Sequence, residues 1–196
     1  MISAVLLAAG ESRRMGKFKQ LLPFAGKTFI ESSVDNLLAS RIGEIIVVTG
    51  HRAEDVNRTL GDRCVRCVYN PDYRSGMSGS IKRGVQAVSE SAHAVMIALA
   101  DQPQIGPDIC DKVIEAYEKS LAQIVVPTYR GRNGHPIILD LGLRAEILSI
   151  DANQGLRQVV HARPDRVSHV EIDSEDVLMD FDFPEDYRRV LIDDTK

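Results

Sequence analysis

Short runs of almost uninterrupted apolar residues alternate along the first half of the chain with segments of helical pattern. Residues 44–49 read EIIVVT and residues 94–100 read AVMIALA, without the polar alternation of a half-exposed strand. Such runs are typical of strands that are buried on both faces. Residues 27–40 and 53–60 have the pattern of helices. We therefore expect an α/β fold: a three-layer, Rossmann-like domain whose mostly parallel sheet carries helices on both faces.

The length and composition of the chain indicate a single domain over residues 1–196. Its 196 residues are 44% hydrophobic, which is enough for a substantial core. No internal repeat or low-complexity linker divides it. We expect only the end of the chain, residues 192–196, to fray.

Composition excludes several classes of function. A net charge of −4 and a pI near 5.7 argue against a nucleic-acid-binding face. No apolar run approaches the length of a membrane span, and no charged segment precedes the first apolar stretch. A cytoplasmic protein is the simplest interpretation. Cys64 and Cys67 form a lone C-x-x-C in a predicted strand, and we interpret them as ordinary thiols rather than a redox or metal site.

The loop after the first apolar run has the features of an anion-binding site. Residues 5–22 read VLLAAGESRRMGKFKQLL, so a turn of small residues is followed directly by a cluster of cationic side chains. Small residues allow a ligand to lie against backbone N–H groups, and the cations provide the charge that a polyphosphate requires. The residues concerned are Ala8, Ala9, Gly10, Arg13, Arg14, Lys17 and Lys19. A basic surface turn is the alternative interpretation.

Two common glycine-rich loops do not match this stretch. A Walker loop has four residues between its glycines followed by Lys-Ser/Thr, whereas five residues separate Gly10 from Gly16, and Phe18 follows Lys17. The dinucleotide fingerprint requires three glycines as G-x-G-x-x-G, which are absent here. The glycine spacing therefore argues against an NAD-type dehydrogenase.

The segment LAAGESRRMGKFKQLL resembles the signature L-A-A-G-x-S-x-R-M-G-x-x-K-x-L-L of nucleotidyltransferases that act on the molybdenum cofactor, the cytidylyltransferases in particular. The resemblance implies the nucleotidyltransferase type of the α/β fold and a loop that wraps the triphosphate. It assigns catalytic roles to Arg14 and Lys19. It also implies nucleotide binding by Leu7, Ala8, Ala9, Gly10, Glu11, Ser12, Arg13, Arg14, Met15, Gly16 and Lys19.

A second loop is predicted to reach the nucleotide. The turn-rich segment NPDYRSGMSGSI follows the third predicted strand, and we expect Ser78 to cap the next helix. It is similar to a family G-M-x-S-S-L segment beside the base. The resemblance therefore implies that Gly76, Ser78 and Ser80 contact base or ribose. Gly79 stands where the family often has serine.

Asp101 is the candidate metal ligand. It ends the apolar run 94–100 and precedes Gln102 and Pro103, so a carboxylate is placed at the end of a central strand, where it can bind Mg²⁺ through oxygen. The alternative is a turn cap before Pro103. The segment resembles the family's D-Q-P, whose aspartate holds the catalytic metal, and this implies a catalytic and metal-binding role for Asp101.

A second acidic segment lies near the end of the chain. Residues 179–187 read MDFDFPEDY and resemble the family's D-I-D-T-P-E-D-Y. The resemblance implies that Asp180 is the second metal ligand. Asp182, two residues on, would share its strand face, and capping of the last helix is an alternative role for either. Residues 151–161 correspond to a family G-D-x-G-x-R element, but Asn153 stands where that element has aspartate, and asparagine is a poorer ligand for a cation than a carboxylate.

The loop 129–136, YRGRNGHP, is predicted to face the acceptor substrate. Its arginines and glycines suit a flexible binding loop, although a solvated turn has a similar composition. It is similar to a family G-x-P or G-H-P, and the family's pterin substrate carries a phosphate. Arg130, Arg132 and His135 are therefore the candidate acceptor-binding residues, and His135 could instead be a ring satisfied within the core.

The resemblance implies Mg²⁺-dependent transfer of CMP from CTP to the phosphate of a molybdopterin-type cofactor, with release of pyrophosphate. A molybdoenzyme or its chaperone would be the partner protein. Ala9 favours CTP, since guanylyltransferases of the family typically have L-A-G-G at this turn. A guanylyltransferase, or a cytidylyltransferase for another phosphorylated acceptor, remains an alternative. An alternative of another class is a non-catalytic carrier of the pterin cofactor.

Overall fold

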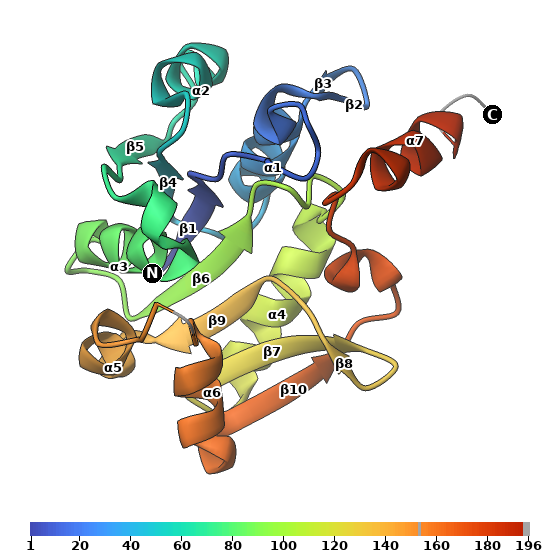
Figure 1. Ribbon diagram of the computed structural model, residues 1–196. Helices are drawn as coiled ribbons and strands as arrows, with labels where there is room; N and C mark the ends of the chain where they lie inside the picture. The colour runs from blue at the N-terminus through green and yellow to red at the C-terminus, as the bar shows by residue number, and fades with distance from the viewer. Residues whose placement is uncertain (153, 194–196) are drawn as a thin grey trace.

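The computed structural model describes residues 1–152 and 154–193, and a twisted central sheet runs through the whole of it (Figure 1). The strands follow the order β10-β7-β9-β6-β1-β4-β5, and β8 pairs with β7. All are parallel except β9 and β8. Their bounds are β1 (Ile2–Ala8), β4 (Glu44–Thr49), β5 (Arg66–Tyr69), β6 (Ala94–Leu99), β7 (Ile124–Tyr129), β8 (Arg132–Asn133), β9 (Ile137–Asp140) and β10 (Val167–Glu171).

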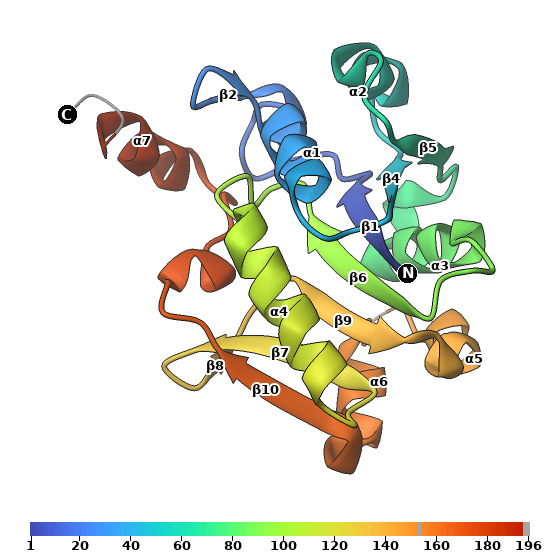
Figure 2. The same ribbon diagram turned by 180° about the vertical axis from the view of Figure 1, so that it is seen from behind.

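Helices cover both faces of this sheet. Figure 2 shows α1 and α4 over one face, whereas α3, α5 and α6 lie over the other. The bounds are α1 (Phe29–Ala39), α2 (Ala53–Leu60), α3 (Met77–Ala87), α4 (Pro107–Lys119), α5 (Arg144–Leu148), α6 (Arg157–Ala162) and α7 (Pro184–Asp193). The predicted three-layer architecture is confirmed.

The alternation of side chains along β1 explains why the sheet needs helices on both faces. Leu6 packs into the cluster beneath α1, α2 and α4, whereas its neighbour Val5 packs against α3. Both side chains are at most 1% exposed. Successive residues of a strand point to opposite faces, so an uninterrupted apolar run supplies two cores at once.

Local sequence explains where the first helices begin. Thr28 and Glu31 form the predicted capping box ahead of α1: the Thr28 N–H donates to Glu31 Oε2 at 2.9 Å, and the Glu31 N–H donates to Thr28 Oγ1 at 3.4 Å. The prediction of Ser78 as a helix cap is wrong. α3 begins at Met77, two residues earlier than a cap at Ser78 would place it, because Gly76 adopts φ +111° and takes the N-cap position itself.

The segments flanking the site differ from the predicted ones. Asp180 and Asp182 lie in a loop between a 3-10 turn, Glu175–Leu178, and α7, not on a strand.

The loop after β7 is a tight hairpin into β8, in which Arg130 and Gly131 both have positive φ. α7 begins at Pro184 as predicted and continues through Asp193; residues 194–196 of the predicted frayed tail lie outside the described residues.

Two sequence-based expectations concern membrane-spanning helices and the cysteine side chains. Within residues 1–152 and 154–193, the helices are too short or too polar to cross a membrane. Cys64 and Cys67 are exposed free thiols and Cys110 is a buried one. Burial raises the pKa of the Cys110 thiol to about 12, so this side chain acts as an apolar packing group.

Candidate active site

A cavity of about 520 Å³ opens at the carboxyl edge of the sheet, where β1 and β6 end. Ligands of open α/β sheets bind in this position because the loops that follow parallel strands meet there. The walls come from the loop after β1, the start of α3, the end of β6 and the loop before α7. The lining residues are Leu7, Ala9, Gly10, Glu11, Ser12, Arg13, Arg14, Lys19, Gln20, Tyr73, Gly76, Met77, Ser80, Leu99, Asp101, Asp180 and Asp182.

The loop after β1 is held in shape by polar contacts within itself. Gln20 is 6% exposed, and its Nε2 donates to the carbonyl oxygens of Ala8 and Gly10, both at 3.3 Å. Ser12 has φ +54° and its Oγ accepts the Lys19 N–H at 3.1 Å. These bonds satisfy backbone groups on the inside of the turn, which leaves its outer surface for a ligand. Sequence reasoning did not identify Gln20, whose role depends on contacts with residues ten and twelve positions away.

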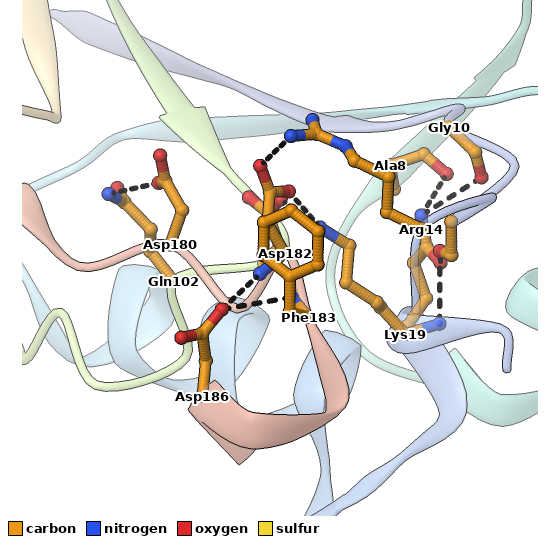
Figure 3. Close-up of polar contacts among 12 residues, drawn as sticks. Ala8, Gly10, Arg14, Lys19, Gln102, Asp180, Asp182, Phe183 and Asp186 are labelled. Carbon is orange, nitrogen blue, oxygen red and sulfur yellow. Dashed lines mark hydrogen bonds and ion pairs between the residues drawn. The ribbon is translucent and has the colours of Figure 1, made fainter. Parts of the chain in front are cut away.

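Lys19 is the charged centre of the site (Figure 3). Its side chain is 9% exposed, and Nζ lies 2.7 Å from Asp101 Oδ2 and 3.0 Å from Asp182 Oδ1. Arg14 Nη1 lies 2.7 Å from the other oxygen of Asp182. Burial lowers the pKa of the Lys19 ammonium, but the two carboxylates outweigh it and the net shift is upward. Lys19 and Arg14 are thus paired with the carboxylates of the opposite wall, whereas Arg13 pairs with Glu11 of its own loop.

Asp180 lies beside this network. Its Oδ1 accepts a hydrogen bond from Gln102 Nε2 at 2.9 Å. Burial, followed by the charges of Asp101 and Asp182, raises the pKa of the Asp180 carboxyl, whereas Gln102 and Lys19 oppose the rise. Burial is the main cause of this rise, and the two neighbouring carboxylates add negative charge that Lys19 opposes. This corner of the cavity therefore favours an additional cation.

The donor set suits a divalent ion, although the carboxylates form no closed cage. Oxygen ligands from Asp101, Asp180 and Asp182 are those that Mg²⁺ and Mn²⁺ prefer. Among the described residues, no three carboxylate, histidine or cysteine groups converge as a ready metal site. Mg²⁺ is commonly held by one or two carboxylates together with substrate phosphates and water, so this open arrangement fits it.

Four residues predicted to bind nucleotide, Ala8, Met15, Gly16 and Ser78, do not line the cavity. Met15 is buried in a cluster with aromatic residues, which anchors the loop from behind. The Ser78 hydroxyl donates to the Asp151 carbonyl oxygen at 2.9 Å and so ties the segment after α5 to the start of α3. Asn153, which stands where the family element has aspartate, lies outside the described residues.

The predicted acceptor-binding residues lie apart from the cavity lining. Arg130 and Arg132 project from the β7–β8 hairpin, which β9 and β6 separate from β1 (Figure 1). Glu171 shapes this hairpin by accepting the Arg130 N–H at 2.7 Å. His135 is half-buried; burial lowers the pKa of its ring, and the negative charge of Asp101 opposes this shift.

Known proteins resemble this chain in both sequence and structure. The MobA-like NTP transferase domain matches residues 4–167. The chain is 29% identical to the molybdenum cofactor cytidylyltransferase of Escherichia coli K12, over 95% of this chain and 93% of that protein. It is 30% identical to nicotine blue oxidoreductase of Paenarthrobacter nicotinovorans, over 97% and 96%. The Rv0371c protein of Mycobacterium tuberculosis H37Rv, solved with manganese, superposes with a TM-score of 0.82 at 25% identity, covering 97% and 98%.

Proposed function

Because the chain belongs to the MobA-like NTP transferase family, we propose that it transfers CMP from CTP to the phosphate of a molybdopterin-type cofactor. Pyrophosphate is the second product, and Mg²⁺ is the divalent ion required. The observation that supports this most directly is the pairing of Arg14 and Lys19 with Asp101 and Asp182 in one cavity. Its volume, about 520 Å³, lies in the ordinary range for small-molecule sites.

The triphosphate would lie along the loop after β1. The loop places Ala9 and Gly10 on the cavity wall, and a Cβ at Gly10 would meet no other atom within 4 Å, so phosphate oxygens have access to the backbone there. Arg13 and Arg14 are 76% and 63% exposed at their side chains. They can therefore turn to the phosphates at little cost in buried contacts.

The reaction is an in-line displacement at the α-phosphorus of CTP. A phosphate oxygen of the acceptor forms the new P–O bond, and the bond from the α-phosphorus to the bridging oxygen of pyrophosphate breaks. Lys19 and Arg14 neutralise charge on the α-phosphate and on the departing pyrophosphate. Mg²⁺, held by Asp101 and Asp180, would supply Lewis-acid stabilisation of the phosphate oxygens. A phosphate monoester is already ionised at neutral pH, so alignment replaces general-base catalysis.

Ala9 supports cytidine as the base. It lines the cavity at the turn where guanylyltransferases of the family typically have glycine, and the preference for cytidine rests on that resemblance. After transfer, the cytidylylated cofactor would pass to a molybdoenzyme or its chaperone in the cytoplasm. Arg130, Arg132 and His135 remain the candidate acceptor-binding residues. The acceptor would then lie over the loop that follows the carboxyl end of β7.

A second candidate function is that of an oxidoreductase. It is favoured by the 30% identity to nicotine blue oxidoreductase, which extends over 97% of this chain. This alternative predicts oxidation of a reduced pyridine nucleotide in the presence of a dye acceptor, without release of pyrophosphate. The glycine spacing of the first loop and the acidic corner at Asp101 favour the transferase instead.

A panel of the four nucleoside triphosphates, with Mg²⁺ and with or without a molybdopterin-type acceptor, tests the proposal by pyrophosphate release. We expect acceptor-dependent release with CTP, and little with GTP. Lys19→Ala and Asp101→Ala should each lower turnover far more than they lower the stability of the fold. If both variants kept wild-type release, the assignment would be wrong. Release without acceptor specificity, or pyridine-nucleotide oxidation alone, would favour the alternatives.

A further inference from the structure

Asn70 is a buried amide at the carboxyl end of β5 whose orientation is fixed. It is 4% exposed, and its Oδ1 accepts the backbone N–H of Asp72 at 3.1 Å. A backbone N–H can only donate, so the oxygen of the amide must face it. The other side of the amide, Nδ2, then donates to Ser80 Oγ at 3.0 Å.

This contact determines what the Ser80 hydroxyl offers to the cavity. Ser80 is 4% exposed, lies in the first turn of α3 and lines the cavity. Its oxygen accepts from Asn70, and among the described residues no protein group accepts its hydrogen. A hydroxyl has one hydrogen to donate. Ser80 therefore presents a hydrogen-bond donor to a ligand.

The surroundings of Ser80 suit a base rather than a phosphate. The wall built by the segment before and at the start of α3 consists of Tyr73, Gly76, Met77 and Ser80, and none of these carries a charge. The cations of the cavity all come from the loop after β1. A single donor in an uncharged wall is the kind of polar group that fixes the orientation of a ligand and selects among ligands.

We propose that Asn70 is a positioning residue for base selection: it holds the Ser80 hydroxyl as a donor toward the O2 and N3 acceptor edge of cytosine. Guanine presents N–H donors on its corresponding edge, so it would leave the buried hydroxyl hydrogen without an acceptor. An unpaired buried polar group weakens binding of the wrong ligand. This inference rests on the proposed nucleotidyltransferase function.

Asn70→Asp tests the proposal with almost no change of shape. The introduced carboxylate still accepts the Asp72 N–H, but it cannot donate, so the Ser80 hydroxyl turns to it and faces the cavity as an acceptor. Binding of CTP and of GTP, each with Mg²⁺, is measured by calorimetric titration without an acceptor substrate. We expect the ratio of CTP to GTP affinity to fall by about 3- to 10-fold. The added negative charge repels both triphosphates alike and cancels in the ratio.

Ser80→Ala provides the matched background. It should lower the same ratio by about 3- to 10-fold, and adding Asn70→Asp to it should lower the ratio no further. In turnover, we expect KM for CTP to rise while kcat stays within about twofold. Ser75→Asp, on the neighbouring turn, controls for charge and should leave the ratio unchanged.

Several results would overturn the inference. An unchanged ratio in Asn70→Asp, or an equal fall with and without Ser80, would show that Asn70 does not act through the hydroxyl. If Asn70→Asp fails to fold, Ser80→Ala alone decides, and an unchanged ratio there also refutes it. Wild-type protein that binds neither triphosphate removes the proposed function and this inference together, whereas normal CTP turnover with insensitive ratios removes only the inference.

Discussion

Lys19 neutralises Asp101, which we propose as a metal ligand together with Asp180, and replacing Lys19 should free that carboxylate for a divalent ion. The ammonium makes contacts of 2.7 Å with Asp101 and 3.0 Å with Asp182. Lys19→Met keeps an unbranched side chain of similar length but removes the charge. We expect the variant to bind Mn²⁺ in the absence of nucleotide more tightly than the wild-type protein does, because no internal cation has to be displaced.

The size of the effect follows from those two contacts. A hydrogen bond to a charged group is typically worth about 1.5–3 kcal/mol. The carboxylates of Asp101 and Asp182 are 27% and 29% exposed at their side chains, so water compensates a large part of the loss when Lys19 leaves. A net cost of about 1.4–2.8 kcal/mol for displacing Lys19 corresponds to a 10- to 100-fold difference in the Kd for Mn²⁺.

The assay is a Mn²⁺ titration followed by electron paramagnetic resonance, because free and bound ions have distinct signals. Lys19→Arg, which keeps the positive charge, is the matched control and should remain weak. CTP should strengthen Mn²⁺ binding to the wild type more than to Lys19→Met, since the triphosphate offers Lys19 another partner. The reasoning is refuted if Lys19→Met binds Mn²⁺ alone no more tightly than the wild type does, or if Lys19→Arg gains as much.

Two further predictions concern stability. Gly84→Ala should lower the free energy of unfolding by about 1–2 kcal/mol, because the new Cβ would overlap Val5 Cγ1 where α3 meets β1. This loss should outweigh the gain from the higher helix propensity of alanine. A melting temperature equal to or above that of the wild type would contradict the prediction. The hydrogen bond from Arg63 is the main cause that lowers the pKa of Asp35, whereas hydrogen bonds with Thr28 are the main cause for Glu31 and Arg63 adds to them. Both carboxyls therefore stabilise the fold above the pKa values of the unfolded chain, near 4, and lose that contribution as the pH falls. Arg63→Gln should therefore flatten the loss of melting temperature between about pH 5 and 3, and an unchanged acid profile would count against this ion-pair cluster.

Much of the scaffold could be predicted from the sequence because its signals are local. The apolar runs of β4 and β6 have enough length and uniformity to indicate parallel strands. The capping box at Thr28 fixes the start of α1 within four residues of chain. The same holds for the loop after β1, where small residues and cations stand together in one turn.

The contacts that complete the site are not local and could not be predicted in the same way. Lys19 and Asp182 are separated by 163 positions, and only the folded sheet edge brings them together. The sequence therefore assigned metal binding to Asp180 and left the ion pairs of Asp182 unseen. The start of α3 was misplaced because Ser78 is a strong capping residue type, whereas the positive φ of Gly76 decided the boundary. Likewise, Ser80 could be named from resemblance, but the role of Asn70 depends on a contact between two elements.

The reversed direction of β9 has a consequence for how this scaffold can diversify. β9 runs antiparallel between β6 and β7, so it interrupts an otherwise parallel sheet between the strands that carry the cavity and the pair formed by β7 and β10. β6 and β7 therefore do not pair with each other. The loops that follow β1 and β6 and the loop that follows β7 reach the carboxyl edge of the sheet from separate groups of strands. Chimeras that exchange everything after β6 among homologues should inherit donor preference from one parent and acceptor preference from the other.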